Sequence, residues 1–117
     1  MHTDPACIFC KIVRRELPAK VVEETEDLIA FYDVNQMAPI HVLIIPKTHV
    51  RSVNELTENS APMLAAMTLL ANKLAQRLNL SDSGYRLVVN TGKDAGQSVF
   101  HIHMHLLGGR QMSWPPG

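Results

Sequence analysis

The spacing of apolar residues along the chain predicts two helices of unequal length. Between Glu58 and Asn79 apolar residues recur every three or four positions, which is typical of one face of a long amphipathic helix. Residues 8–15 follow the same period over a shorter stretch that Leu17 and Pro18 bring to an end. We therefore expect a brief N-terminal helix and one long helix.

The remaining apolar segments are extended in character and outnumber the helices. They cover residues 20–24, 28–33, 40–45, 85–91 and 99–107. The acidic turn at residues 24–27 joins the first two as a hairpin, and only one long helix interrupts the series. We expect an α+β fold in a single domain over residues 1–117, with an antiparallel sheet of about five strands and the long helix on one face.

Composition limits which partners this domain is expected to bind and where in the cell it is expected to be. Eleven basic residues balance eleven acidic ones among 117, so no overall field attracts a nucleic-acid backbone or an anionic membrane. No apolar run approaches the roughly 20 residues that span a bilayer, and residues 1–6 lack a signal-peptide pattern. We expect a cytoplasmic protein, in which the Cys7-x-x-Cys10 pair suggests metal binding or redox chemistry.

Three histidines occupy alternate positions of the last predicted strand. Because alternate residues of a strand share a face, His101, His103 and His105 should point the same way. The opposite face is apolar and is expected to join the core through Phe100, Ile102, Met104 and Leu106. A solvated polar face is the simplest alternative, but three of the chain's six histidines fall within five residues. The outer two Cα atoms lie about 13 Å apart in a strand, too far for all three side chains to close on one metal ion.

Such a row of imidazoles suits phosphoryl chemistry. A neutral histidine can attack through one ring nitrogen while a hydrogen bond orients the other, and a neighbour about 7 Å along the strand can donate to the phosphoryl oxygens. The loop over residues 90–98 precedes this row. Gly92 and Gly96 permit turns that expose N–H groups to an anion, and Gln97 and Ser98 add side-chain donors. Such a loop is often a plain connector, but beside three histidines it predicts a phosphate site.

Residues 101–107 read His-φ-His-φ-His-φ-φ, where φ is apolar, and match the signature of the histidine triad (HIT) family at every position. The chain resembles the Hint branch of that family in particular. The resemblance extends over residues 38–46, residues 96–101 and the ending 108–117. It covers almost the whole chain.

The resemblance implies hydrolysis of purine nucleoside 5′-phosphoramidates, as by an adenosine monophosphoramidase, through a covalent nucleotidyl-histidine intermediate and without a catalytic metal. His103 would be the nucleophile, and His105 would bind and polarise the α-phosphate. The backbone of His101 would fix the tautomer of His103, Ser98 would contact the leaving group, and His41 would relay a proton. Nucleotidyl transferases of the superfamily carry Gln in place of the third histidine, so His105 indicates hydrolysis.

The resemblance also implies a nucleotide-binding set. Asn90 and Gln97 would hold phosphate oxygens, and Asp33 would bind the ribose hydroxyls. The base would lie in an apolar slot formed by Ile8, Phe9, Phe31, Val34 and Leu43. The full set also includes Gly96, Ser98, Val99, His103, His105 and Trp114.

Some HIT proteins hold a structural zinc ion, and four residues here match the positions of its ligands: Cys7, Cys10, His49 and His101. Two thiolates and two imidazoles make a closed tetrahedral site with no open position for water. The alternative is a pair of buried thiols beside an exposed His49.

Trp114, the only tryptophan, lies in a proline-rich tail that can continue neither sheet nor helix, so it is expected to pack outside its own core. Family members form two-fold dimers with this tail near the partner's site, which implies a homodimer. An exposed tryptophan on a monomer is the alternative.

Two other functions compete with a phosphoramidase. The first is hydrolysis of dinucleoside polyphosphates or of adenylate attached to nucleic acid, which the zero net charge and the lack of a basic domain disfavour. The second is a nucleotide-binding interaction protein with incidental hydrolysis. Catalytic activity that depends on His103 distinguishes the enzymatic hypotheses from the hypothesis of a nucleotide-binding interaction protein.

Overall fold

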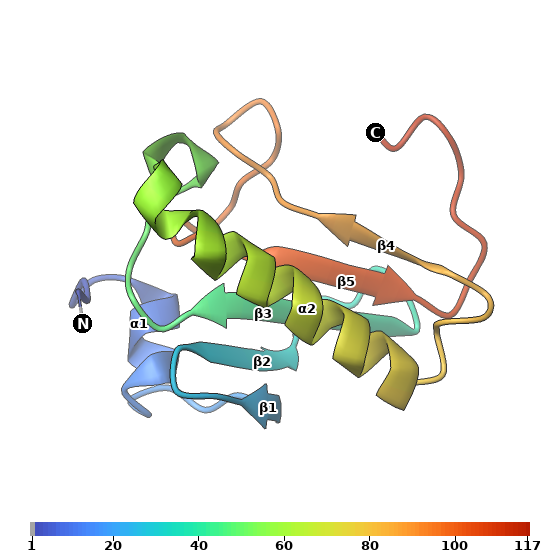
Figure 1. Ribbon diagram of the computed structural model, residues 1–117, viewed down its shortest axis with the longest axis horizontal. Coiled ribbons are helices and arrows are strands. Elements are labelled where there is room, and N and C mark those ends of the chain that lie inside the picture. Colours follow the sequence, from blue (N-terminus) through green and yellow to red (C-terminus); the bar gives the residue numbers. More distant parts are fainter. Residues whose placement is uncertain (1) are drawn as a thin grey trace.

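The computed structural model describes residues 2–117, which form one antiparallel sheet with a helix on each face (Figure 1). The elements are α1 (Ile8–Val13), β1 (Val21–Glu24), β2 (Leu28–Tyr32), β3 (Ile40–Pro46), η1 (Val53–Glu55), η2 (Glu58–Ser60), α2 (Ala61–Arg77), β4 (Tyr85–Val88) and β5 (Met104–Gly108). The strand order is β1-β2-β3-β5-β4, and every neighbouring pair is antiparallel. The predicted fold class is confirmed. Within the described residues, no helix has both the length and the apolar character to cross a membrane.

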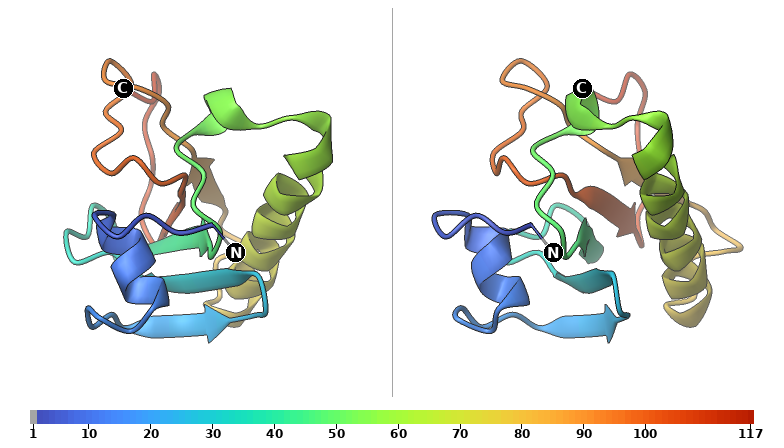
Figure 2. Two further views of the ribbon diagram at one scale, coloured as in Figure 1. Left: turned by 90° about the vertical axis from the view of Figure 1, so that its left-hand side faces the viewer. Right: turned by 60° about the vertical axis from the view of Figure 1, so that its left-hand side comes forward.

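The central strands are buried on both faces, which explains their nearly continuous apolar sequence. Alternate residues such as Val42 and Ile44 of β3 pack in the core beneath α2. Residues of the other parity, Leu43 and Ile45, pack with Phe9 of α1. Figure 2 shows the sheet lying between the two helices. The sheet therefore has an α2 face, which holds the main core, and an α1 face.

The long helix begins three residues later than predicted. Pro62 is the second residue of α2, and a proline ring collides with the carbonyl group four residues before it, here that of Glu58. Residues Glu58–Ser60 consequently form a separate 3-10 turn. The helix ends at Arg77, and Asn79 then takes a left-handed conformation with φ of 62°.

The last predicted strand is shorter than expected, because β5 begins at Met104 and residues 99–103 are not part of the sheet. The Ile102 N–H donates instead to the carbonyl of Val50, at 2.7 Å. Phe100 was expected in the core but is 42% exposed. The predicted strand over 85–91 ends early at Val88 for a related reason, since its partner β5 extends only one residue beyond the pair Val88↔His105.

Candidate active site and metal centre

His103 precedes the first residue of β5 and is buried on the α1 face of the sheet, with an exposed fraction of 4%. Its Nδ1 lies 2.8 Å from the carbonyl oxygen of His101. Because a carbonyl oxygen can only accept, the proton of neutral His103 sits on Nδ1 and the lone pair is on Nε2. Burial lowers the pKa of His103, so the imidazole is neutral near pH 7. The result is a tautomer suited to nucleophilic attack through Nε2.

His105 is held in the opposite tautomer by a chain of hydrogen bonds that starts from the main chain. The Met37 N–H donates to Nδ1 of His41, at 3.1 Å, so the proton of His41 sits on Nε2. This Nε2 donates in turn to Nδ1 of His105, at 2.9 Å, which leaves the proton of His105 on its own Nε2. The Nε2 atom of His105 is buried and has no hydrogen-bond partner among the described residues. An unsatisfied buried donor of this kind suits a phosphate oxygen.

Burial also keeps the histidines around His105 neutral. It lowers the pKa of His105 to about 4, and the neighbouring His103 and His41 lower it further in the same direction. Burial lowers the pKa of His41 as well, against the attraction of the Asp33 carboxylate, whose Oδ2 lies 3.3 Å from His41 Nε2. The site therefore presents one imidazole lone pair and one imidazole N–H without placing a net positive charge on either ring.

Both rings face a cavity of about 1220 Å³ on the α1 face of the sheet. Its size accommodates a nucleotide-sized ligand. Ten predicted site residues line it: Ile8, Phe9, Phe31, Asp33, Val34, Leu43, Ser98, Val99, His103 and His105. Seven further residues line the cavity that were not predicted as site residues: Ile12, Leu17, Pro18, Ala19, Lys20, Tyr32 and Gln36. The helical spacing from Ile8 to Ile12 is the signal that could have found the first of these.

Gln97 braces its own loop and does not offer a donor to a ligand. Its Nε2 donates to the carbonyl oxygens of Arg51, at 2.8 Å, and Val99, at 3.1 Å. Its backbone N–H donates to the carbonyl of Gly92, and its Oε1 accepts the Gly92 N–H. These bonds use all three N–H groups of Gln97 and give this residue a structural role in the loop.

Three other residues of the predicted nucleotide-binding set, Asn90, Gly96 and Trp114, do not line the cavity. The Gly96 N–H was expected to face an anion but donates to the carbonyl of Lys93, at 3.0 Å. Trp114 is 81% exposed in the C-terminal tail. His41 stands behind His105, where it contacts Nδ1 and not the cavity.

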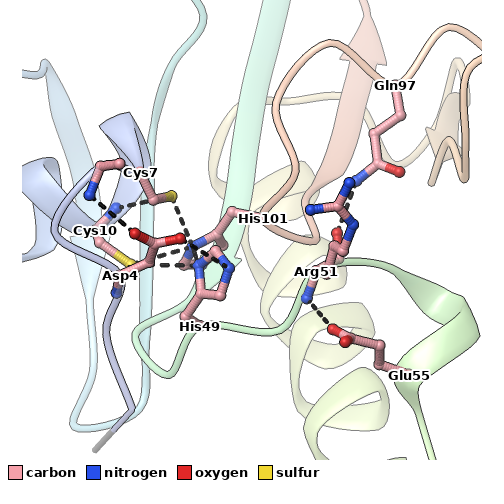
Figure 3. Close-up of polar contacts among 9 residues, drawn as sticks. Asp4, Cys7, Cys10, His49, Arg51, Glu55, Gln97 and His101 are labelled. Carbon is pink, nitrogen blue, oxygen red and sulfur yellow. Dashed lines mark hydrogen bonds and ion pairs between the residues drawn. The ribbon is translucent and has the colours of Figure 1, made fainter.

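A second cluster lies where α1, the segment after β3 and the segment before β5 meet (Figure 3). Nδ1 of His101 lies 3.4 Å from Sγ of Cys7, 3.6 Å from Sγ of Cys10 and 3.2 Å from Nδ1 of His49. Sγ of Cys10 lies 3.4 Å from Nδ1 of His49. Tetrahedral zinc requires about 3.5 Å between sulfur and nitrogen ligands and about 3.3 Å between two nitrogens. The four donors thus fit one zinc ion.

The tautomer of His101 also fits a metal ligand. Its Nε2 lies 2.8 Å from the carbonyl oxygen of Pro46 and must donate to it, so the lone pair of neutral His101 is on Nδ1 and points into the cluster. Burial lowers the pKa of His101 to about 4, which keeps that lone pair available.

Known proteins resemble the chain over nearly its full length. A model of the HIT domain matches residues 14–112. An uncharacterized HIT-like protein of Synechocystis is 47% identical over 94% of this chain and 96% of its own length. A 14 kDa zinc-binding protein of Zea mays is 46% identical over 97% of this chain and 90% of its own. The crystal structure of a HIT family hydrolase from Legionella pneumophila superposes with a TM-score of 0.93 at 51% identity, covering 95% of this chain and 99% of that one.

Proposed function

The chain belongs to the HIT family, and on that premise we propose that it is a nucleotide hydrolase that cleaves purine nucleoside 5′-phosphoramidates. One observation carries the proposal. His103 and His105, with ring centroids 5.0 Å apart, present complementary tautomers to the same cavity, one with a lone pair and the other with a buried, unpartnered N–H. A phosphorus atom needs a nucleophile and its oxygens need a donor, and this pair offers both.

The reaction has two steps. Nε2 of His103 forms a bond to the α-phosphorus while the bond from phosphorus to the leaving nitrogen breaks, giving a nucleotidyl-histidine and an amine. Water then attacks the phosphorus and the bond to Nε2 breaks, which releases the nucleoside monophosphate. The leaving nitrogen takes one proton from solvent as its bond to phosphorus breaks. The water that attacks in the second step returns one proton to solvent, so one water molecule is consumed over the two steps. His105 Nε2–H donates to a phosphate oxygen throughout, and Ser98 lies at the cavity wall where it can contact the leaving group.

The nucleoside occupies the part of the cavity between α1 and the sheet. Apolar side chains from both walls form a slot for a flat base, with Phe9 and Phe31 packed edge to face at 5.6 Å between ring centroids. Asp33 lines the same cavity and can accept hydrogen bonds from the ribose hydroxyls. The proposed contacts thus divide between base, sugar and phosphate along one cavity.

We also propose that Cys7, Cys10, His49 and His101 hold a structural zinc ion. When bound, zinc would tie the N-terminal segment to the loop before β5 and, with four protein ligands, would leave no position to activate water. The HIT relative from Zea mays is named a zinc-binding protein, which supports this proposal.

The test compares wild type with His103→Ala on adenosine 5′-phosphoramidate. We expect the variant to lose turnover and to keep its affinity for AMP, because the cavity walls remain in place. Rapid acid-free quenching of wild type should trap adenylate on the protein, and His103→Ala should trap none. His2→Ala is the matched control, since His2 is exposed and lies outside the cavity. Full turnover by His103→Ala would refute the proposal.

A further inference from the structure

A smaller cavity of about 300 Å³ adjoins the active-site cavity. The two share three lining residues, Ile8, Ser98 and Val99. The histidines His103 and His105 belong to the larger cavity alone. Ser98 and Val99 therefore border both the cavity that holds His103 and His105 and the smaller cavity.

Arg51 is the one arginine or lysine among the described residues that line the smaller cavity. Its Cζ lies 4.4 Å from the centroid of the Phe100 ring, which also lines this cavity, so a cation–π contact holds the guanidinium beside that ring. The backbone of Arg51 is fixed on both sides, because its N–H donates to the Glu55 carboxylate and its carbonyl accepts from Gln97 (Figure 3). No carboxylate of the described residues lies within ion-pair distance of this guanidinium.

Asp4 is the one carboxylate among the described residues that line the smaller cavity, and one of its two oxygens is hydrogen-bonded. Its Oδ1 accepts the Ala6 N–H, at 2.9 Å, and its Oδ2 lies 4.0 Å from Nε2 of His49. The negative charge of Asp4 is thus directed toward the N-terminal segment and His49. Arg51 is left as the cation available to a ligand in this cavity.

The proposed reaction places a leaving group at this point. In an in-line displacement the leaving group lies opposite Nε2 of His103. Ser98, which the proposed function places at the leaving group, lines both cavities. We propose that the smaller cavity binds the leaving group and that Arg51 selects leaving groups carrying an anion, either a carboxylate or a phosphate. The inference rests on the proposed phosphoramidase function and adds a specificity-determining residue to it.

The experiment measures kcat/KM for three adenosine 5′-phosphoramidates with leaving amines of similar length: β-alanine, 2-aminoethyl phosphate and the neutral β-alanine amide. We expect wild type to favour at least one anionic substrate over the neutral one by about fivefold, the upper range for a solvent-exposed ion pair. Arg51→Gln should abolish that preference and Arg51→Lys should keep part of it. Lys93→Gln removes a cation that does not line the cavity and should keep the wild-type ratio. The preference should also weaken as salt is raised in wild type and not in Arg51→Gln.

The outcomes separate the two proposals. If wild type cleaves unsubstituted adenosine 5′-phosphoramidate and shows no preference for either anion, the inference fails while the proposed function stands. An unchanged ratio of anionic to neutral substrate in Arg51→Gln has the same meaning. If wild type cleaves none of the phosphoramidates, the proposed function itself fails. The anionic substrate that wild type prefers shows whether the smaller cavity binds a carboxylate or a phosphate.

Discussion

Acidification should destabilise the folded protein through His105. Burial lowers the pKa of His105 in the folded state to about 4, from 6.5 in an exposed histidine. In this range the unfolded chain binds a proton and the folded chain does not, so the unfolded state gains stability as the pH falls. The contribution of neutral His105 to the free energy of unfolding is therefore fully present above pH 6.5 and is lost as the pH falls toward 4. Each pH unit between these two values is worth about 1.4 kcal/mol, which gives about 2 kcal/mol between pH 7 and pH 5.

His105→Gln removes this titrating group, and urea unfolding of wild type and variant at both pH values measures its effect. We expect wild type to lose about 2 kcal/mol more than the variant between pH 7 and pH 5. His101, whose pKa is also lowered to about 4, is present in both proteins, so its contribution cancels from the comparison. Between pH 7.5 and 8.5 the two proteins should respond alike, since His105 stays neutral there. Equal losses on acidification would show that the folded protein does not hold His105 in its neutral form.

Two further predictions concern the metal centre and the tail. Purified wild type should contain near-stoichiometric zinc by metal analysis, and Cys7→Ser should lose the zinc and melt at a lower temperature; metal-free wild type with an unchanged melting temperature would refute the site. We expect wild type to sediment as a dimer and Trp114→Ala as a monomer in sedimentation velocity, because the indole is 81% exposed and makes a suitable interface anchor. A wild-type monomer at every concentration would exclude that role.

The sequence predicted the parts of the fold that follow from side-chain period. The step of three or four residues located α2, and the extended apolar segments at residues 28–33 and 40–45 located β2 and β3. The alternation from Ile102 to Leu106 also held, since Ile102, Met104 and Leu106 are all buried.

The features that the sequence did not predict depend on contacts between segments far apart in the chain. The local order of residue types does not indicate such contacts. Strand propensity continues through residues 99–103, but the Ile102 N–H finds its acceptor in Val50 and not in the sheet. Gln97 carries the donors expected of a phosphate ligand, yet they meet the carbonyls of Arg51 and Val99. The tautomer of His105 depends on a backbone N–H at Met37, which the residue types alone do not indicate.

The tautomers of four histidines are set by main-chain atoms. The carbonyl of Pro46 acts on His101, the carbonyl of His101 acts on His103, and the N–H of Met37 acts on His41 and, through it, on His105. A main-chain atom is present whichever side chain a position carries. Substitution at position 101 can therefore remove a proposed zinc ligand while the acceptor for His103 stays in the chain. The orientation of His103 and the proposed metal centre can thus change independently of each other, although both involve residue 101.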